Sequence, residues 1–257
     1  MSLPAPIPLR LRAGAGRRAL AGHPWVFSNE LDGVPKSDAM PAGSDVVIHD
    51  ARGRFVGRGY AHPGTLIAAR ILSRDEGEDI DADWLVRRLD RALALRKATC
   101  AGRTAFRWAH AEADGLPGLI IDRYDGPGGA RVVTQHNTAG MERLRPLIEG
   151  VLQERYGMVA GIRRSTGRGR ALEGLPDDVG VSFGSQDAGP WTIDDDGAAV
   201  SFDPLTGQKT GLFLDMWANR RRFAPVLGAG RVADLFCYVG QWGLAAARAG
   251  AQQVVCV

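Results

Sequence analysis

The sequence predicts a multidomain protein of the α+β and α/β classes, built from three consecutive parts. Residues 1–74 form a small β-rich domain, residues 80–195 a central α+β domain, and residues 196–257 the beginning of a parallel α/β sheet. Two observations carry this prediction. Short strand-like runs alternate with turn signals near the start, and a strand, a glycine turn, a helix and a strand follow one another at the end. A length of 257 residues allows one large domain or two to three small ones.

The first domain is predicted to be a compact β-barrel. Turns that contain glycine or proline separate three strand-like runs, at residues 45–49, 54–60 and 65–72. Trp25 and Phe27 precede these runs. We expect both in the core rather than as base-stacking platforms, because large aromatic side chains are usually buried.

The central domain is predicted to combine helices with a mixed sheet. An acidic linker at residues 75–79 leads to an amphipathic helix at residues 83–98, with Asp83 near its start as a cap and its arginines on a solvated face. The remaining expected elements are strands around a turn within 104–136, a helix at 140–156, a strand at 158–162, and a connector with a short hairpin at 165–196.

Three acidic residues of this domain, Glu112, Asp114 and Asp122, allow a metal-binding or acid–base interpretation. We favour a structural role, because they flank the rigid turn at residues 115–118. Carboxylates commonly bind the free backbone N–H groups of such turns. We therefore expect no metal site here.

The last fifty residues carry the pattern of a nucleotide-binding unit. Apolar residues at positions 232, 233, 235 and 236 are typical of a buried parallel strand. Gly240 and Gly243 favour a tight turn, and a small-residue helix at 244–249 leads to a strand at 253–257. A ligand is expected at the carboxyl end of the strands. The dinucleotide motif G-x-G-x-x-G is absent.

A loop upstream of this unit combines three kinds of hydrogen-bond donor. Gln208, Lys209 and Thr210 lie between two glycines, and such a loop can wrap a carboxylate or a ribose. The spacing is not that of a phosphate-binding P-loop. Asp215 and Arg220 follow on a predicted helix.

Three motifs, in this order, resemble one known family. They are GHPWVF at residues 22–27, HAEADGLPGLIIDRY at 110–124, and GQKTGLFLD at 207–215 followed by the turn from Asp234 to Gly240. The last turn resembles the first motif of class I S-adenosylmethionine methyltransferases. Together the motifs are similar to the large-subunit ribosomal RNA cytosine-C5 methyltransferase family, which implies a PUA-like barrel, a central EEHEAD-type domain and a Rossmann-like class I sheet.

The resemblance implies S-adenosyl-L-methionine as cofactor and 23S ribosomal RNA as substrate, with cytosine C5 as the methylated position. The implied cofactor-binding residues are Gln208, Lys209, Thr210, Phe213, Asp215, Arg220, Asp234, Phe236, Tyr238 and Gly240. The residues at positions 216–218 depart from the family pattern, so contacts from them are not implied.

The resemblance implies RNA binding by the first domain, and clustered arginines favour it as well, because guanidinium groups bind phosphates in a bidentate way. Of the 32 basic residues only three are lysine, although GC-rich codon usage explains most of this bias. The predicted RNA-binding residues are Arg10, Arg12, Arg17, Arg18, His23, Arg163 and Arg164.

Cytosine-C5 methylation uses a cysteine thiolate that adds to C6 of the base. Cys237 lies inside the cofactor motif, so we do not expect it to be this nucleophile. The resemblance places the catalytic cysteine beyond Val257, which leaves no catalytic residue within the chain. We accordingly expect a truncated, inactive member that exposes an apolar strand edge at Val254, Val255 and Val257.

Composition excludes several other classes. No apolar run of 18 residues predicts a membrane span, and the N-terminus lacks a secretion signal, so we expect a cytoplasmic protein. Three cysteines without C-x-x-C spacing argue against a zinc site and a disulfide framework. A homodimer is compatible with the resemblance. Two alternatives stay open: a non-catalytic RNA-binding protein, and a small-molecule enzyme that uses a nucleotide at the Gln208 loop.

Overall fold

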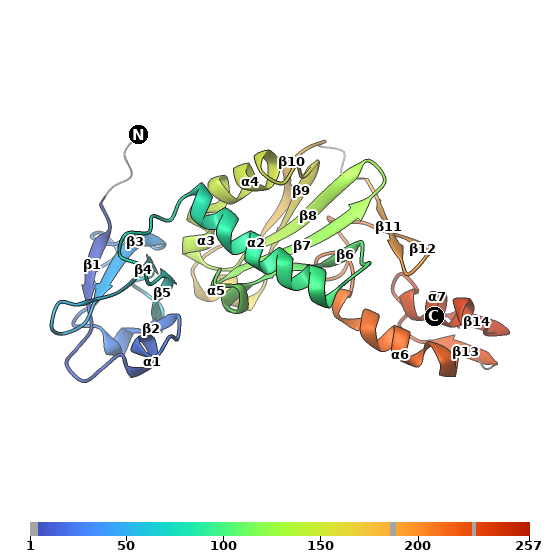
Figure 1. Cartoon of the computed structure of the whole chain (residues 1–257), viewed down its shortest axis with the longest axis horizontal. Coiled ribbons are helices and arrows are strands. Elements are labelled where there is room, and N and C mark those ends of the chain that lie inside the picture. The colour runs from blue at the N-terminus through green and yellow to red at the C-terminus, as the bar shows by residue number, and fades with distance from the viewer. Residues whose placement is uncertain (1–4, 186–188, 228–229) are drawn as a thin grey trace.

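The computed structural model describes residues 5–185, 189–227 and 230–257. Three units lie in a row along the long axis of the molecule (Figure 1). The predicted connector at 165–196 includes residues 186–188, which lie outside the described part. Within the described residues, no helix is long and apolar enough to cross a membrane.

The N-terminal unit is a five-stranded sheet that closes around a core. Its strand order is β1-β3-β4-β5-β2, and only the β1–β3 pair is parallel. A bridge between Leu11 and Leu31 joins the two edges of the sheet. The elements are β1 (Ile7–Arg10), α1 (Arg17–Leu20), β2 (Trp25–Phe27), η1 (Ser28–Glu30), β3 (Ser44–His49), β4 (Phe55–Ala61) and β5 (Ile67–Ser73). The strand-like runs of the sequence are thus confirmed to within two residues.

The aromatic residues of β2 are not core residues, contrary to the expectation. Val26 is fully buried, whereas Trp25 and Phe27 are only half-buried, because alternate side chains of a strand face opposite sides. Trp25 donates from Nε1 to Glu112 Oε1 at 2.8 Å, which links this unit to the central one. Arg18 lies over the ring of Phe27 at 4.6 Å.

Tyr60 of β4 packs in the interface between the N-terminal and central units. Its hydroxyl donates to the carbonyl oxygen of Pro117 at 2.7 Å and lies 2.9 Å from Thr138 Oγ1. The ring packs on Gly140, where a Cβ would lie 2.0 Å from the Tyr60 ring. A buried ion pair between Arg70 and Glu173, 2.8 Å apart, closes the same interface.

Replacing Gly140 with alanine should therefore destabilise the protein by roughly 2 kcal/mol, because the hydrogen-bonded Tyr60 ring cannot withdraw. Gly150 provides the matched control. It lies in α4 (Arg145–Glu154), and a Cβ there would meet nothing within 4 Å. Gly150→Ala should stabilise the protein by about 0.5–1 kcal/mol. Urea unfolding of both variants measures the difference in stability. Equal effects of the two substitutions would contradict the tight packing of the Tyr60 ring on Gly140.

The central unit is a five-stranded mixed sheet of order β10-β9-β8-β7-β6, with β8 and β9 parallel. Its strands are β6 (Ala105–His110), β7 (Leu119–Gly126), β8 (Gly129–His136), β9 (Ala160–Ser165) and β10 (Asp178–Phe183). Its helices are α2 (Ala82–Thr99), η2 (Ala111–Asp114), α3 (Ala139–Arg143), α4 and α5 (Arg168–Leu172).

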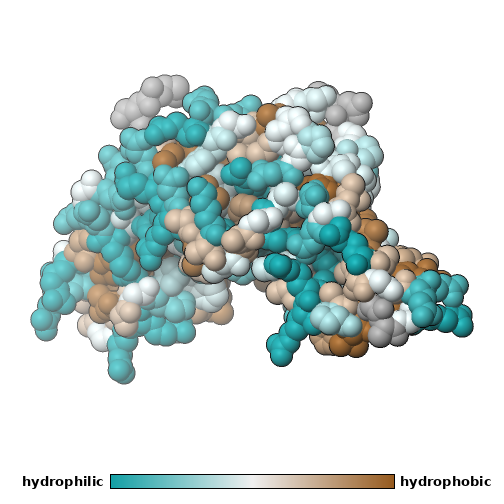
Figure 2. Space-filling model, turned by 45° about the vertical axis from the view of Figure 1, so that its right-hand side comes forward, coloured by the Kyte–Doolittle hydropathy of each residue, from teal (hydrophilic) through white to brown (hydrophobic). Residues whose placement is uncertain are grey.

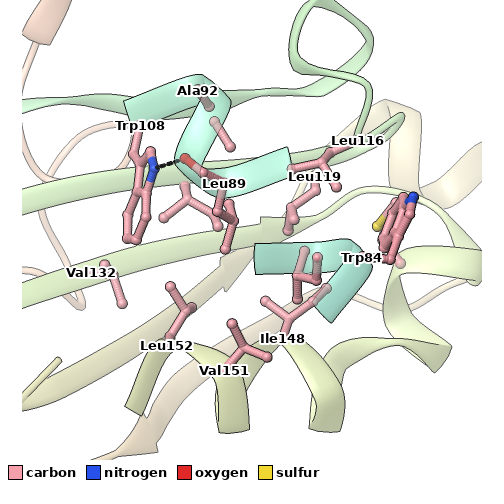
Figure 3. Close-up of a cluster of buried hydrophobic side chains, with 14 of the residues drawn as sticks. Trp84, Leu89, Ala92, Trp108, Leu116, Leu119, Val132, Ile148, Val151 and Leu152 are labelled. Carbon is pink, nitrogen blue, oxygen red and sulfur yellow. Dashed lines mark hydrogen bonds between the residues drawn. The ribbon is translucent and has the colours of Figure 1, made fainter. Parts of the chain in front are cut away.

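One face of this sheet carries the largest core. Helices α2 and α4 lie over it, and buried side chains such as Leu89, Trp108 and Leu152 fill the space between (Figure 3). Trp108 donates from its indole Nε1 to the carbonyl oxygen of Leu89 at 3.0 Å, which satisfies a buried polar group (Figure 3).

Several details of the central unit differ from the prediction. The cap of α2 is Asp81, whose side chain accepts from Trp84 N, and not Asp83. The helix predicted at 140–156 is two helices, α3 and α4, because Pro146 starts a new helix at its first turn. Arg96 of the expected solvated face is mostly buried and paired with Asp114 at 2.6 Å.

A hairpin covers the opposite face of the central sheet. Strands β11 (Trp191–Asp195) and β12 (Ala198–Phe202) pack Trp191 and Phe202 against Tyr124 of β7. Asp196 and Gly197 form its two-residue turn, both with positive φ, as an Asp-Gly hairpin requires. The expected hairpin therefore lies at the end of the connector, and the predicted domain boundary at 195–196 falls on its turn.

The C-terminal unit contains the predicted strand, turn, helix and strand. Its elements are η3 (Leu214–Met216), α6 (Trp217–Leu227), β13 (Arg231–Asp234), α7 (Gln241–Arg248) and β14 (Gln253–Cys256). Strands β13 and β14 are parallel, and α7 connects them. The β-α-β arrangement is thus confirmed.

The expectation that the run 231–236 is buried was wrong. Leu235 is 63% and Phe236 96% exposed, because β13 ends at Asp234 and both residues lie in the turn that follows it, beside a sheet of two strands in the described chain. Val255 and Val257 are exposed too, as expected, while Val254 is half-buried. Hydrophobic patches are accordingly visible on the C-terminal unit, at the lower right of Figure 2.

Candidate functional site

Backbone strain concentrates in the two segments that the sequence singles out. Five non-glycine residues of the described chain have positive φ, and three of them are Lys209, Phe236 and Tyr238. A left-handed conformation costs such residues of order 1 kcal/mol or more, and it persists where surrounding structure imposes it. Strain of this kind gathers at ligand sites, so both segments are site candidates.

Tyr238 holds these two segments together. Its hydroxyl accepts from the backbone N–H of Gln208 at 3.0 Å and donates to the carbonyl oxygen of Gly211 at 2.9 Å. Gly207 allows this approach, because a Cβ there would lie 2.5 Å from the Tyr238 hydroxyl. The segment around Gln208 and the segment around Tyr238, thirty residues apart in the chain, are therefore held side by side.

A cavity of about 230 Å³ opens at the carboxyl end of β13. Five of the predicted cofactor residues line it together: Phe213, Arg220, Asp234, Phe236 and Tyr238. We refer to it as the strand-end cavity. Its position is the one at which open parallel α/β sheets bind their ligands.

The strand-end cavity is built by Asp234 and the start of α7. Asp234 is buried, and its Oδ2 accepts from the backbone N–H of Gly243 at 2.8 Å. Gly243 has no room for a side chain, since a Cβ would lie 2.5 Å from Cys256 Sγ. Gly240 starts the helix with φ of 72°, so both predicted glycines have a conformational or packing reason.

Arg220 is fixed by a buried network. It donates to Asp195 Oδ2 at 2.6 Å, and Arg103 donates to the other carboxylate oxygen at 2.5 Å. Gln241 of α7 also donates to Asp195, at 2.7 Å. Burial alone would raise the pKa of Asp195, but the hydrogen bond from Arg103 and the charge of Arg220 outweigh it and hold this pKa below its ordinary value.

Thr210 anchors its loop to the central sheet and does not line the strand-end cavity. The hydroxyl donates to Asp122 Oδ2 at 2.5 Å, and the hydroxyl of Tyr124 donates to the carbonyl oxygen of Thr210 at 3.1 Å. Asp122 also pairs with Arg107 at 2.8 Å. Asp122 therefore has a structural role, but not the predicted one, because its carboxylate binds the side chains of Thr210 and Arg107 and not a backbone N–H group of the turn at residues 115–118. The described residues contain no group of three or more acidic, His or Cys side chains placed for a metal ion.

Lys209, Asp215 and Phe213 line a second hollow of about 670 Å³, which we call the β6 groove. It lies between the end of α2, strand β6 and the segment 209–217. Phe213 is common to the β6 groove and the strand-end cavity, so the two hollows are neighbours. Gln208 is exposed and lines neither.

The predicted RNA-binding arginines of the N-terminal unit, Arg10, Arg12, Arg17 and Arg18, are all exposed. His23 accepts from the backbone N–H of Trp25 at 3.1 Å, which is a turn role. Arg163 and Arg164 of β9 are less available for RNA binding, because both have partners within the protein. Arg163 pairs with Asp178 at 2.9 Å, and Arg164 donates to the carbonyl oxygen of Gly207.

Sequence reasoning missed several residues of the site. Gln241, Trp242 and Met216 line the strand-end cavity, and Arg103 and Asp195 fix Arg220 from another unit. Arg103 and Asp195 are 92 positions apart, so no local pattern could pair them. Gln241 directly follows Gly240, and its place at the first turn of α7 was the available signal.

Comparison with known proteins finds similarity along nearly the whole chain. Residues 9–74 match the family of PUA-like domains. The chain is 36% identical over 250 residues to ribosomal RNA large subunit methyltransferase I of Shewanella amazonensis, and 38% over 253 residues to that of Shewanella frigidimarina. Each match covers 96% of this chain and 62% of the relative, so the chain spans less than two thirds of these relatives.

Solved structures show the same fold. A SAM-dependent methyltransferase from Streptococcus mutans superimposes with a TM-score of 0.73 at 18% identity, over 97% of this chain and 62% of the other. A methyltransferase complexed with SAH superimposes with a TM-score of 0.73 at 16% identity over the same shares. The chain therefore has a PUA-like N-terminal domain, shares its fold with SAM-dependent methyltransferases, and is homologous to large-subunit ribosomal RNA methyltransferases I.

Proposed function

We propose that this chain is the RNA-binding and cofactor-binding part of an S-adenosyl-L-methionine-dependent methyltransferase that acts on large-subunit ribosomal RNA. The observation that carries the proposal is the strand-end cavity, where five predicted cofactor residues from two distant segments meet. The names of the relatives and the SAH complex of a similar fold point to the same cofactor.

The donors and acceptors around the strand-end cavity fit the cofactor. Asp234 Oδ2 binds Gly243 N–H, and in the described chain Oδ1 is left to accept from a ligand amino group. Phe236 offers an exposed aromatic face, and its strained backbone is pre-formed. When bound, the cofactor would supply an electrophilic methyl group. At about 230 Å³ the cavity is smaller than most complete ligand sites, so it suits one end of the cofactor.

The finer assignment is C5 of cytosine in 23S ribosomal RNA, which rests on the family resemblance. That reaction needs a thiolate on the far side of the base. Cys237 lines the strand-end cavity itself, so we give it no such role and assign no catalytic residue in the described chain. Lack of methyl transfer by this chain alone, a homodimer and a cytoplasmic location remain predictions.

Calorimetric titration of the 257-residue chain with S-adenosylhomocysteine tests the proposal. We expect binding with a Kd of about 0.1 mM or weaker, as suits a partial site. Phe236→Ala should weaken it at least about fivefold, since the ring lines the cavity and its exposure makes a folding defect unexpected. Val226→Ala removes a similarly exposed side chain on α6, outside the cavity, and should not change the affinity.

Two results would overturn the proposal. One is the absence of S-adenosylhomocysteine binding at millimolar concentration. The other is tighter binding of ATP, which would favour the nucleotide-using small-molecule enzyme. Micromolar binding of S-adenosylhomocysteine would instead contradict the view that the chain holds only part of the site.

A further inference from the structure

We infer that the β6 groove binds a single-stranded segment of the RNA substrate, with Lys209 as a phosphate contact rather than a cofactor contact. The inference rests on the proposed function and adds to it a location for the RNA strand next to the cofactor. It uses a different hollow and, apart from Phe213, which borders both hollows, different residues from those that carry the cofactor assignment.

The β6 groove follows the free edge of the central sheet. Strand β6 is the last in the order β10-β9-β8-β7-β6, and η3 lies beside it. Arg107 pairs across the sheet with Asp122, and Gln135 pairs with Ile120, two residues before Asp122. Since residues two apart on a strand share a face, Arg107 and Gln135 project on the same side, where Thr210 also docks.

The surface that a ligand meets in the β6 groove is rich in hydrogen-bond donors. Arg107, Lys209 and Gln135 line it, and so does the exposed His110. Arg107 uses Nε and Nη2 to bind Asp122, so its Nη1 is directed to the His110 side, 3.4 Å from that ring.

The acids that balance the arginines of the β6 groove lie behind them. The side chain of Asp122 is 0% exposed and that of Asp114, which pairs with Arg96, is 4% exposed. Among the residues that the structure describes, Asp215 is the one carboxylate that lines the groove. A phosphate therefore meets guanidinium and ammonium groups, while the buried carboxylates keep the arginine side chains in place.

Aromatic side chains complete the match to a single strand. Phe106, Phe213 and Trp217 line the β6 groove, and each is half-buried. Proteins that hold single-stranded nucleic acid combine cations for the backbone with aromatic rings on which bases stack. A volume of about 670 Å³ is within the range that accommodates a nucleotide-sized ligand.

The β6 groove shares a wall with the strand-end cavity, and this gives the groove its role in methyl transfer. Phe213 borders both hollows and packs edge-on against Tyr238 of the cofactor turn, with ring centroids 6.1 Å apart. A base that leaves its stack in the groove is therefore adjacent to the strand-end cavity. Enzymes that modify a base must take it out of the stack in this way.

Lysine footprinting provides a sharp test, because the chain has only three lysines. Lys209 lines the β6 groove, Lys97 is exposed on the same helix as Arg96 but outside the groove, and Lys36 is exposed in the N-terminal unit. We would label the full chain with an amine-reactive reagent, with and without a single-stranded oligoribonucleotide of about ten nucleotides. We expect protection of Lys209 and none of Lys97.

Affinity measurements with charge-reversed variants provide the second readout. Lys209→Glu should weaken oligoribonucleotide binding roughly 5- to 20-fold at low salt and reduce the salt slope by about one. Lys97→Glu, the matched control, should change neither. Equal labelling of Lys209 with and without RNA, equal effects of the two variants, or equal protection of Lys209 by polyglutamate would overturn the inference.

These outcomes are separable from those of the proposed function. If the chain binds S-adenosylhomocysteine but RNA does not protect Lys209, RNA binding in the β6 groove is refuted and the proposed cofactor site is retained. If RNA protects Lys209 but the chain binds no S-adenosylhomocysteine, the proposed cofactor site is refuted and RNA binding in the β6 groove is retained.

Discussion

Asp195→Asn is expected to destabilise the protein by about 3–5 kcal/mol, because it leaves two buried guanidinium groups without their shared carboxylate. The side chains of Arg103 and Arg220 are only 3% and 4% exposed, so water cannot replace the lost charge. Arg103 keeps a second acid, Asp196 at 3.2 Å, whereas for Arg220 the ion pair with Asp195 is the one found in the described chain. Arg220 and its helix α6 should therefore be released first.

Urea unfolding at pH 7 measures this loss, and Asp194→Asn is the control. Asp194 precedes Asp195 in the same strand but is exposed, and its replacement keeps an oxygen for the turn N–H of Gly197. We expect less than about 1 kcal/mol for the control. S-adenosylhomocysteine binding should weaken in the Asp195 variant, since Arg220 lines the strand-end cavity. Equal stability of the two variants would show that the network is dispensable.

His136 should make the fold sensitive to acid. The side chain is fully buried at the end of β8, and in the described chain neither ring nitrogen has a hydrogen-bond partner. Burial, together with the charges of Arg145, Arg170 and Arg163, lowers the pKa of His136 to about 3, although Asp178 opposes this shift.

The direction of the pH effect follows from this depressed pKa. In the unfolded chain the ring takes up a proton near pH 6.5, while in the folded protein it stays neutral down to about pH 3. Its contribution to stability is therefore complete above pH 6.5 and is lost as the pH falls between these values. From pH 7.5 to pH 4.5 we expect a loss of about 2–3 kcal/mol from this residue.

Replacement of His136 by leucine separates this effect from other titrations. The side chains are similar in size and no hydrogen bond is lost, so His136→Leu should be at least as stable at pH 7.5 and lose less stability at pH 4.5. His110→Leu removes an exposed histidine and controls for the loss of one titratable ring. Unfolding at the two pH values provides the comparison. An identical loss in wild type and His136→Leu would refute the role of His136.

Local patterns were sufficient for most of the secondary structure. Turn residues delimited β3, β4 and β5 to within two positions, and helical spacing placed α2 and α7. The turn from Asp234 to Gly240 was informative for the same reason, because Asp234 accepts a hydrogen bond from the N–H of Gly243 in the first turn of α7, nine residues away. Such interactions connect near neighbours, so their signal is present in a single stretch of sequence.

Burial was predicted less well, because it depends on what covers a segment. The apolar residues at 232, 233, 235 and 236 are typical of a buried parallel strand, yet β13 ends at Asp234 and Phe236 is almost fully exposed in the turn that follows. Trp25 is half-buried because the barrel core takes Val26, and its indole is used to bind Glu112 of the next unit.

The sequence by itself determined the order of the three units, the β-α-β arrangement of the C-terminal unit and the two segments that supply the candidate site. Only the tertiary structure decided how the site residues divide: Thr210 anchors the loop, Lys209 lines the β6 groove, and Arg220 is held by Asp195. The physical reason is distance along the chain. Asp195 is 92 residues from Arg103 and 25 from Arg220, and such pairs exist only after the units pack.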